Sequence, residues 1–379
     1  MLQKVAIVDV AQTNHSERLE DNIREIVFEL VKQLLDRLGI ERSDIGSMIS
    51  SSSDYFQGIS CSNSYYYDAA GANLKSGSKT PEDSALAFIY GLMRILSGEY
   101  KTVLVVSITK CSEVPSVHTL TNLIADPFFQ RPIGLNEVVT AGLQAREYMD
   151  RYGLTKEQLA RVVIKNLGNA RNNPYAHRSG EFSIKDVLAS PIMVSPLREM
   201  DIASTSDGAC AMLLAAEEVA KDLTDTPVFV EGVGWSANST FLGDQDLLNG
   251  SLPLAAKMAY RMAGVKDPLQ EIDVAEICDT TSFHEILWLE QLGFCRPGEG
   301  GRLIDEGITT ISGKLPVNPS GGLMGANPYV ARGLIRIAEA ALQLKGEAGN
   351  HQVTNVNKAL AHSVHGLGGQ LHSVVILGK

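Results

Sequence analysis

Short apolar runs alternate with helix-spaced apolar positions near the start of the chain. The segments at 5–10, 47–52 and 102–109 have the length and the bounding turn residues of strands, although 47–52 holds only two apolar residues. Between them, apolar side chains recur every three to four residues over about 21–39 and 82–97, a spacing that predicts helices with one buried face. This part of the chain is therefore expected to form a βαβαβ unit.

The same alternation returns further along the chain. It predicts, in order, a strand at 228–234, a helix at 253–264, a strand at 273–278, helices at 283–293 and about 329–345, and paired strands at 358–364 and 372–377. Apolar strands that alternate with helices imply mostly parallel sheets covered on both faces. We predict an α/β fold in which two duplicated βαβαβ halves form a five-layer α-β-α-β-α arrangement.

The boundary between the halves is predicted near residue 225. The N-terminal half then spans 1–225 and the C-terminal half spans 226–379. Within the first half, about 111–200 is rich in Pro, Asn and His, as in Asn172–His177. Such a long, irregular segment inside a compact domain usually shapes a binding site, so we expect an inserted loop or lid region here.

Composition narrows the functional classes. Lys and Arg number 33 against 44 Asp and Glu, a formal net charge of −11, which disfavours binding to nucleic acid or to an anionic membrane. No apolar run reaches the roughly 18–20 residues of a membrane span, and the chain opens on a strand-like segment, so a cytoplasmic location is expected. The five cysteines are scattered without a C-x-x-C pair, which argues against disulfides and a structural metal site.

Three stretches carry a resemblance that extends over nearly the whole chain. They are Ser97–Tyr100 leading into 103–106, the small-residue segment 206–211, and 318–323 continuing to 343–349. These segments resemble the thiolase superfamily, in which the second would be a turn that opens a central helix. The resemblance implies a coenzyme A thioester as substrate, no permanently bound cofactor, and a homodimer that can double into a tetramer.

Two further segments are similar to one branch of that superfamily. Asp126–Pro132 and His365–Gly369 look like the sterol-carrier-type and archaeal branch. Members of that branch often work with a small zinc-ribbon/OB-fold protein that helps to bind acyl-CoA. The resemblance therefore implies such a partner, or a second thiolase subunit.

The nucleophile of the superfamily is missing from its expected place. Thiolase chemistry needs a cysteine thiolate at a helix N-terminus, where the helix dipole lowers the thiol pKa. Counting back from Ser97 puts this position at 81–83, where the sequence reads Pro-Glu-Asp without a cysteine. One interpretation is helix capping alone, with Thr80 as N-cap and acidic residues in the first turn. The other makes Glu82 or Asp83 a fixed anion or general base, with Ser84 as a remote nucleophile.

The other catalytic positions of the resemblance are altered as well. Asn327 stands where a G-H-P loop would place a histidine, and its amide can donate a hydrogen bond but cannot titrate. Cys278 stands where His or Asn would be expected, either as a displaced nucleophile or as an ordinary buried thiol. His365 matches a histidine of the archaeal-type enzymes and is the strongest catalytic candidate. Tyr329 is the candidate proton donor for a reaction without a covalent intermediate.

Two glycine-rich turns are candidates for substrate or CoA binding. The turn at 320–325 offers Ser320, Gly321 and Gly322, whose N–H groups could hold a thioester oxygen, although a turn required by tight packing explains it equally well. The second turn offers Gly368 and Gly369 next to His365.

Three functions remain open at this point. The chain could form or cleave a carbon–carbon bond by thiolase-like acyl transfer, such as thiolysis of a β-ketoacyl-CoA, within a hetero-oligomer. It could be a non-covalent retro-aldolase acting on a β-hydroxyacyl-CoA. It could also be an inactive supporting subunit of a heteromeric thiolase.

Overall fold

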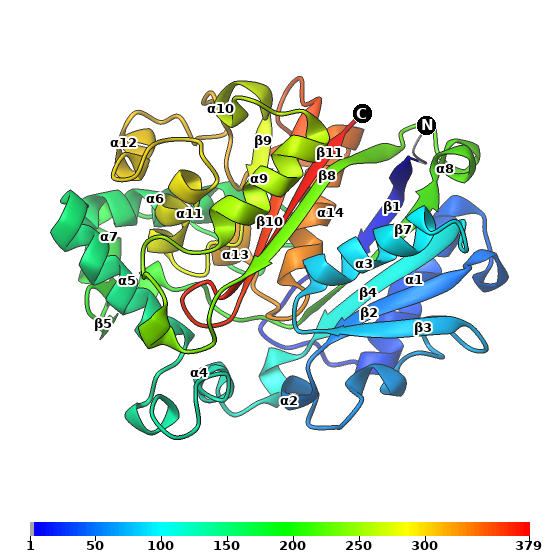
Figure 1. Cartoon of the computed structure of the whole chain (residues 1–379), viewed down its shortest axis with the longest axis horizontal. Helices are drawn as coiled ribbons and strands as arrows, with labels where there is room; N and C mark the ends of the chain where they lie inside the picture. The colour runs from blue at the N-terminus through cyan, green and yellow to red at the C-terminus, as the bar shows by residue number, and fades with distance from the viewer. Residues whose placement is uncertain (1–3) are drawn as a thin grey trace.

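The computed structural model describes residues 4–379, and its centre is one nine-stranded sheet (Figure 1). The strand order is β3-β2-β4-β7-β1-β8-β11-β10-β9. The strands are β1 (Val5–Gln12), β2 (Ser47–Ser52), β3 (Ser76–Pro81), β4 (Thr102–Thr109), β7 (Gly208–Ala216), β8 (Val228–Ala237), β9 (Val274–Glu276), β10 (Lys358–His365) and β11 (Leu371–Gly378). Strands β1, β2, β3, β4 and β7 therefore come from the first half of the chain, and the others come from the second.

The sheet is mixed, which corrects the prediction of mostly parallel sheets. Only the pairs β2–β3, β2–β4 and β9–β10 are parallel, and every other neighbouring pair is antiparallel. The two halves meet where β1 pairs with β8 over Ala6↔Phe229 and Ile7↔Val228. The error has a physical cause, because an apolar run shows that a strand is buried but carries no sign of its direction.

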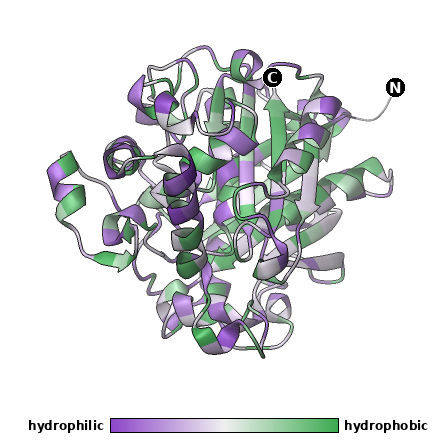
Figure 2. Ribbon diagram, turned by 60° about the vertical axis from the view of Figure 1, so that its left-hand side comes forward, coloured by the Kyte–Doolittle hydropathy of each residue, from purple (hydrophilic) through white to green (hydrophobic). Residues whose placement is uncertain are grey.

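The helices confirm the predicted five layers, because each half of the sheet is one layer and helices form the other three. α1 (Ile23–Leu38) and α8 (Glu217–Leu223) pack on one face of the first half-sheet. α3 (Ser84–Leu96) and α14 (Arg332–Lys345) pack on each other, and one apolar cluster joins them to strands of both halves. α9 (Leu252–Ala263) and α11 (Ser282–Gln291) contribute to the cluster on the far side of the second half. Figure 2 shows hydrophobic residues along the central strands.

Local signals explain why the best-predicted helix forms where it does. α1 begins after Asn22, whose side chain accepts hydrogen bonds from the backbone N–H groups of Arg24 and Glu25, and the Glu25 side chain completes a capping box. It ends at Gly39, which adopts the left-handed conformation with φ 65°. Its apolar stripe faces the sheet, so sequence and structure agree to within two residues at each end.

Two local predictions were wrong. Segment 206–211 does not open a helix, because β7 begins at Gly208. Thr80 and Pro81 belong to strand β3, which the apolar pattern did not predict, and the N-cap of α3 is Asp83 instead. The missed strand is poor in apolar residues because it forms one end of the sheet and is only partly buried.

The segment predicted as a lid contains helices that pack beside the second half of the sheet. They are α4 (Val117–Asn122), α5 (Glu137–Tyr152), α6 (Lys156–Ala170) and α7 (Ile184–Ala189), followed by the small hairpin of β5 (Ile192–Val194) and β6 (Leu197–Arg198). Short helices α2 (Asp54–Gln57), α10 (Pro268–Glu271), α12 (Gly300–Asp305) and α13 (Gly322–Gly325) complete the described elements of four or more residues in α-helical conformation.

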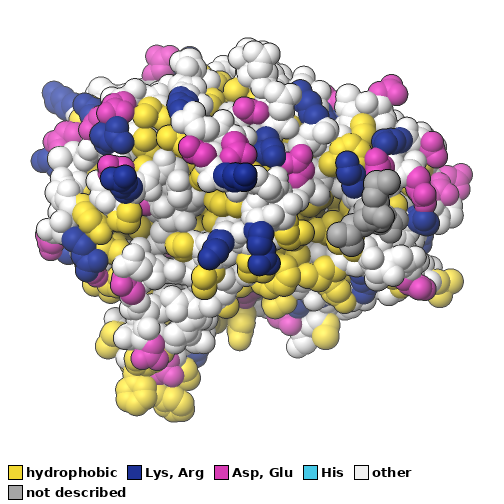
Figure 3. Space-filling model, turned by 45° about the horizontal axis from the view of Figure 1, so that its top comes forward, with side chains coloured by type: hydrophobic (Ala, Val, Ile, Leu, Met, Phe, Trp, Pro, Cys, Tyr) yellow, Lys and Arg dark blue, Asp and Glu magenta, His cyan; other side chains and the backbone are white. Residues whose placement is uncertain are grey.

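The surface carries both signs of charge. Figure 3 shows basic and acidic side chains interspersed over one face, with apolar groups between them. Within residues 4–379, no helix combines the length and the apolar character that a bilayer crossing requires.

Candidate active site

Two long helices point their N-termini at the same place. The backbone N–H of Leu334 in α14 donates to Ser84 Oγ in α3 at 2.9 Å. A Cβ on Gly333 would lie 2.9 Å from the backbone nitrogen of Ala85, so only glycine allows this approach. Because a helix N-terminus carries partial positive charge, the junction favours negative charge developing nearby.

Glu82 lies at this junction and contacts His365. Glu82 Oε2 is 2.8 Å from His365 Nε2, and Oε1 accepts a hydrogen bond from Ser53 Oγ at 3.0 Å. Their side chains are 15% and 17% exposed, so both are reachable from outside. Glu82 has φ 59°, a left-handed conformation that is strained for a residue with a side chain.

The electrostatics keep this carboxyl group ionised. Burial by itself raises the pKa of Glu82, but the hydrogen bond and charge of His365, together with Ser53 and Arg332, bring the pKa below its ordinary value. The structure therefore brings together two of the predicted site residues, Glu82 and His365, as a carboxylate–imidazole pair.

Asp83 is the N-cap of α3, whereas the sequence predicted Thr80 as the cap and Asp83 in the first turn of the helix. Asp83 Oδ1 accepts from the Ala85 backbone at 2.9 Å and from Ser363 Oγ at 2.9 Å, and Oδ2 accepts from Ser373 Oγ at 2.8 Å. These bonds tie the start of α3 to β10 and β11. Asp83 is almost fully buried, so its carboxylate is committed to the framework while Glu82 faces the site.

Tyr329 contributes a buried phenol beside the pair. Its ring stacks on Phe56 with centroids 4.7 Å apart and meets the ring of His365 edge-on at 6.2 Å. Burial raises the pKa of Tyr329 well above 10.0, and the negative charge of Glu137 acts in the same direction. Among residues 4–379, no group forms a hydrogen bond with its hydroxyl. This leaves a protonated donor without a protein partner.

Asn327 lies two residues earlier in the same loop. Its backbone oxygen accepts from the Ser206 backbone at 3.1 Å, which fixes the loop against the segment before β7. Its side-chain Oδ1 has no hydrogen-bond partner among the described residues. Within 4–379 this side chain forms no hydrogen bond with Glu82 or His365, so a role for Asn327 stays a prediction.

Sequence reasoning missed an ion pair that borders the site. Arg332 is 2% exposed, and its Cζ lies 4.4 Å from the ring centroid of Tyr329. Its Nη1 and Nη2 each lie 3.2 Å from Glu137 Oε1, and Nη2 also donates to the Val364 oxygen at 2.7 Å. One signal could have found it, because Arg332 opens α14 where the helix dipole disfavours positive charge.

Cys278 does not have the surroundings of a nucleophile. It is fully buried in the apolar cluster that contains α11, and this burial raises its thiol pKa to about 11. Since the thiolate is the reactive form, the thiol is largely unreactive near neutral pH. These surroundings favour the interpretation as an ordinary buried thiol.

The glycine-rich turn at 320–322 is already engaged in hydrogen bonds and close packing within the protein. Ser320 Oγ donates to Glu276 Oε2 at 2.7 Å and accepts from Arg336 Nη1 at 2.7 Å. A Cβ on Gly321 would lie 2.5 Å from Ala170 Cβ, and one on Gly322 would overlap Asp279 Oδ1. The long helix α14 starts only at Arg332, and these contacts favour the packing interpretation of the turn.

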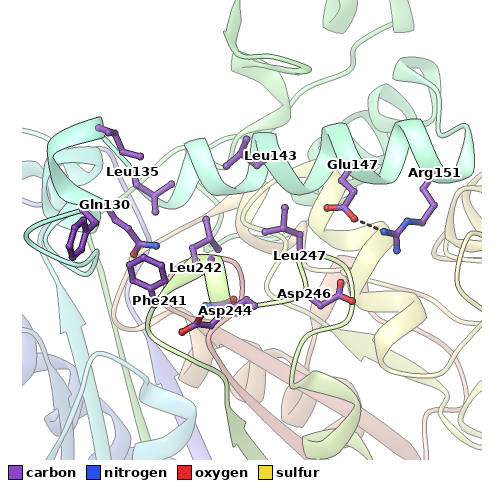
Figure 4. A pocket seen from close by; sticks show the side chains of 14 residues that line it. Gln130, Leu135, Leu143, Glu147, Arg151, Phe241, Leu242, Asp244, Asp246 and Leu247 are labelled. Atoms are coloured by element: carbon purple, nitrogen blue, oxygen red, sulfur yellow. Dashed lines mark hydrogen bonds and ion pairs between the residues drawn. The ribbon is translucent and has the colours of Figure 1, made fainter.

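The turn after His365 borders a large pocket. Leu242 and Gln245 line this pocket of about 860 Å³, and both approach Gly368 closely enough that a Cβ there would lie 3.1 Å from each. Figure 4 shows α5 along one side, with Leu143, Glu147 and Arg151, and the loop 241–247 opposite. Apolar and polar residues line it in similar numbers, and Glu147, Arg151, Asp244 and Asp246 are the charged ones. A pocket of this size can hold a small organic ligand.

Comparison with known proteins gives consistent results. A family model described as "Thiolase C-terminal domain-like" matches residues 235–379. The chain is 32% identical over 376 residues to an acetyl-CoA acetyltransferase of Methanothermobacter thermautotrophicus, covering 97% of this chain and 98% of the relative. It is 36% identical over 246 residues to sterol carrier protein 2 of Oryctolagus cuniculus, covering 63% of this chain but only 44% of that protein.

One solved structure shows the same fold over nearly its full length. The structure described as "Ltp2-ChsH2(DUF35) aldolase" superposes with a TM-score of 0.84 at 24% identity, covering 99% of this chain and 98% of the other. At this level of identity the likeness supports the fold alone.

Proposed function

Because this chain belongs to the thiolase superfamily, we propose that it is a non-covalent retro-aldolase that cleaves the carbon–carbon bond of a β-hydroxyacyl-CoA. The observation that carries the proposal is the pair formed by Glu82 and His365, 2.8 Å apart. A carboxylate in place of a thiolate is a poor nucleophile toward a thioester, but it is well suited to orient and charge-stabilise an imidazole.

In this mechanism His365 transfers the proton, and Glu82 orients the imidazole ring of His365. With Nε2 bound to Glu82, Nδ1 is the ring nitrogen that takes the proton from the β-hydroxyl of the substrate. The Cα–Cβ bond then breaks, an aldehyde or ketone leaves, and the bonding electrons form the enolate of the shortened acyl-CoA. Glu82 stays ionised and stabilises the imidazolium.

The enolate needs positive charge and a proton. The N-termini of α3 and α14 meet beside the pair and favour the oxyanion. The hydroxyl of Tyr329, buried and without a partner among the described residues, donates its proton to Cα. His365 then releases its proton and the phenolate takes one up, which restores both groups. Substrate and products then balance as one β-hydroxyacyl-CoA giving one carbonyl compound and one acyl-CoA.

The pocket beside Gly368 is the proposed site for the coenzyme A arm. Its walls, α5 and loop 241–247, hydrogen-bond through Gln144 and Gln245 to the turn that follows His365. In this proposal the thioester extends from the pocket past that turn toward the pair. Apolar side chains along it suit the pantetheine chain.

We also propose that the chain works as a homodimer with a zinc-ribbon/OB-fold partner. Strand β3 forms an open end of the sheet, and the apolar residues Tyr90, Met93 and Leu96 of the neighbouring α3 are exposed, both features of surfaces that self-associate. The proposal of a partner rests on the resemblance to the archaeal branch. It is supported by the aldolase structure with the same fold, whose description includes a DUF35 protein.

The test is a product analysis of two reactions run side by side. The purified protein, with and without a co-expressed partner, is given a β-hydroxyacyl-CoA alone, and separately a β-ketoacyl-CoA with free CoA. We expect release of a carbonyl compound and a shorter acyl-CoA in the first reaction only, with no acyl adduct in the intact mass. Cleavage that requires free CoA, or an acyl adduct on this chain, would overturn the proposal.

A further inference from the structure

Arg332 is a fixed cation beside the reacting groups. Its guanidinium is anchored to the backbone oxygen of Val364, the residue before His365, at 2.7 Å. It also lies 4.4 Å from the ring centroid of Tyr329, and both the residue and its helix α14 are buried. A buried arginine cannot lose its proton, so it requires an anion close by at all times.

Glu137 supplies that anion in an imperfect way. Both guanidinium nitrogens reach the same oxygen, Oε1, at 3.2 Å. A well-formed pair between arginine and a carboxylate uses both oxygens in two parallel hydrogen bonds of about 2.7–2.9 Å. The Glu137 side chain is 17% exposed, whereas that of Arg332 is 3% exposed, so the carboxylate is the partner with access to the outside.

The position of Glu137 in the fold allows its side chain to move away from Arg332. It is the first residue of α5, the helix that lines the proposed coenzyme A pocket, and the loop before it carries the exposed residues Phe129 and Ile133. Apart from the bonds to Arg332 and those within α5, Glu137 forms one further hydrogen bond within residues 4–379. Its backbone N–H donates to Thr121 Oγ1 over a long distance of 3.5 Å. The arginine is held by the framework, and the glutamate side chain is not.

We propose that Arg332 binds a carboxylate carried by the acyl group of the substrate, which takes the place of Glu137. The substrate class is then an acyl-CoA with a free carboxylate on its acyl chain. This inference rests on the proposed function for the position of the thioester, but it concerns binding rather than cleavage. When the acyl chain is neutral, Glu137 stays paired with Arg332. A free carboxylate on the acyl chain can instead form two parallel hydrogen bonds to Arg332, which Glu137 does not form.

The test compares two thioesters with acyl chains of four carbons. Binding of succinyl-CoA and butyryl-CoA is measured by isothermal titration calorimetry on the full chain, in complex with its partner if one co-purifies. We expect succinyl-CoA to bind about tenfold more tightly or better, as one charge-assisted pair of hydrogen bonds supplies. Because no turnover is needed, a failure of the retro-aldolase assay would leave this result standing.

Two variants separate recognition from structure. Glu137→Gln weakens the competing occupant, so the ratio of succinyl-CoA to butyryl-CoA affinity should rise by several-fold. Arg332→Gln should abolish the ratio, and if that variant does not fold, Glu137→Gln alone decides. Glu181→Gln, which removes an exposed glutamate paired with Arg171, is the matched control and should leave the ratio as in the wild type.

Four results would overturn the proposal. They are equal affinity of the wild type for the two thioesters, no measurable binding of either, an unchanged or lower ratio in Glu137→Gln, and an unchanged ratio in folded Arg332→Gln. Each of these outcomes would mean that the ion pair only fastens α5 to α14.

Discussion

At the scale of single residues, neighbours in the sequence have opposite tasks. Glu82 and Asp83 are both acidic and both near the start of α3, yet Asp83 holds three framework groups while Glu82 faces His365. The left-handed backbone of Glu82 turns its side chain away from the cap. Strain at such a position is typical of a residue kept for chemistry.

The first prediction concerns Glu82→Gln. The amide can still bond to Ser53, but it carries no charge to stabilise a protonated His365. We expect kcat for retro-aldol cleavage to fall by roughly 10²- to 10⁴-fold, with an unchanged circular dichroism spectrum. Because the pKa of Glu82 lies below its ordinary value, the carboxylate is ionised at neutral and alkaline pH, and the loss should persist across that range. Full activity in the variant would remove Glu82 from the mechanism.

The second prediction uses the unpartnered phenol. Tyr329→Phe keeps the stacking on Phe56 and removes a buried hydroxyl that no described residue bonds. Losing an unsatisfied polar group should leave the free energy of unfolding unchanged or raise it by up to about 1 kcal/mol. Turnover should fall by about 10²-fold or more, since the proton donor is gone. Urea unfolding and a rate assay on the same sample test this, and a variant that is stable and fully active would contradict the donor role.

At the scale of elements, the site depends on how α3 is fastened to the second half of the sheet. Asp83 caps α3 and accepts from hydroxyls on β10 and β11, so one carboxylate links elements that are far apart along the chain. Moving α3 would move Glu82 away from His365, since His365 is the last residue of β10.

The third prediction measures this link. Asp83→Ala removes the cap and leaves the hydroxyls of Ser363 and Ser373 without their acceptor in a buried place, so the free energy of unfolding should fall by about 2–4 kcal/mol. Thr155→Ala, which removes a cap of α6 that binds only near its own helix start, is the control and should cost about 1 kcal/mol. Equal losses in the two variants would show that the links to the sheet contribute nothing.

At the scale of the whole molecule, buried histidines set the response to acid. Burial lowers the pKa of His15, His284 and His372 to about 3, and it lowers that of His362 well below 6.5. These four are neutral in the folded protein, whereas an unfolded histidine takes up a proton below about pH 6.5. Their contribution to stability is therefore complete above about pH 6.5 and is lost as the pH falls toward about 3.

The fourth prediction concerns the part of the stability that the buried histidines lose on acidification. Each of these histidines lowers the free energy of unfolding by up to about 1.4 kcal/mol per pH unit below about pH 6.5. Asp279 acts in the opposite sense, because burial and the charge of Glu285 raise its pKa to about 8, and so does His351, whose pKa is raised by Glu339 against the effect of burial. Burial also raises the pKa values of Asp201, Glu276 and Glu290, which act in the same sense as Asp279, and it lowers the pKa of His177, which acts with the four histidines. The contribution of one histidine is therefore measured by difference. In urea unfolding at pH 7, 6 and 5, the wild type should lose stability relative to His284→Gln as the pH falls, because the variant has no histidine to protonate there when it unfolds. The same pH dependence in both proteins would contradict this account.

The sequence determined the layers of this protein because periodicity is a local property. Apolar runs and helix-spaced stripes predicted most strands and the helices α1, α3, α9, α11 and α14, but not the long helices α5 and α6. Counting from the Ser97 motif put Glu82 at the nucleophile position. Strand β3 escaped because an edge strand needs few apolar residues. The resemblance pointed to His365, but it did not show that Glu82 is the partner of His365.

Only the tertiary structure decided which distant groups meet. The antiparallel placement of β7, the contact of Glu82 with His365, and the ion pair of Arg332 with Glu137 all join segments from different parts of the chain. Such contacts depend on the paths of loops and on the packing of whole layers. These carry no repeating pattern of apolar residues, so hydrophobic periodicity sets the framework while the packed fold sets the chemistry.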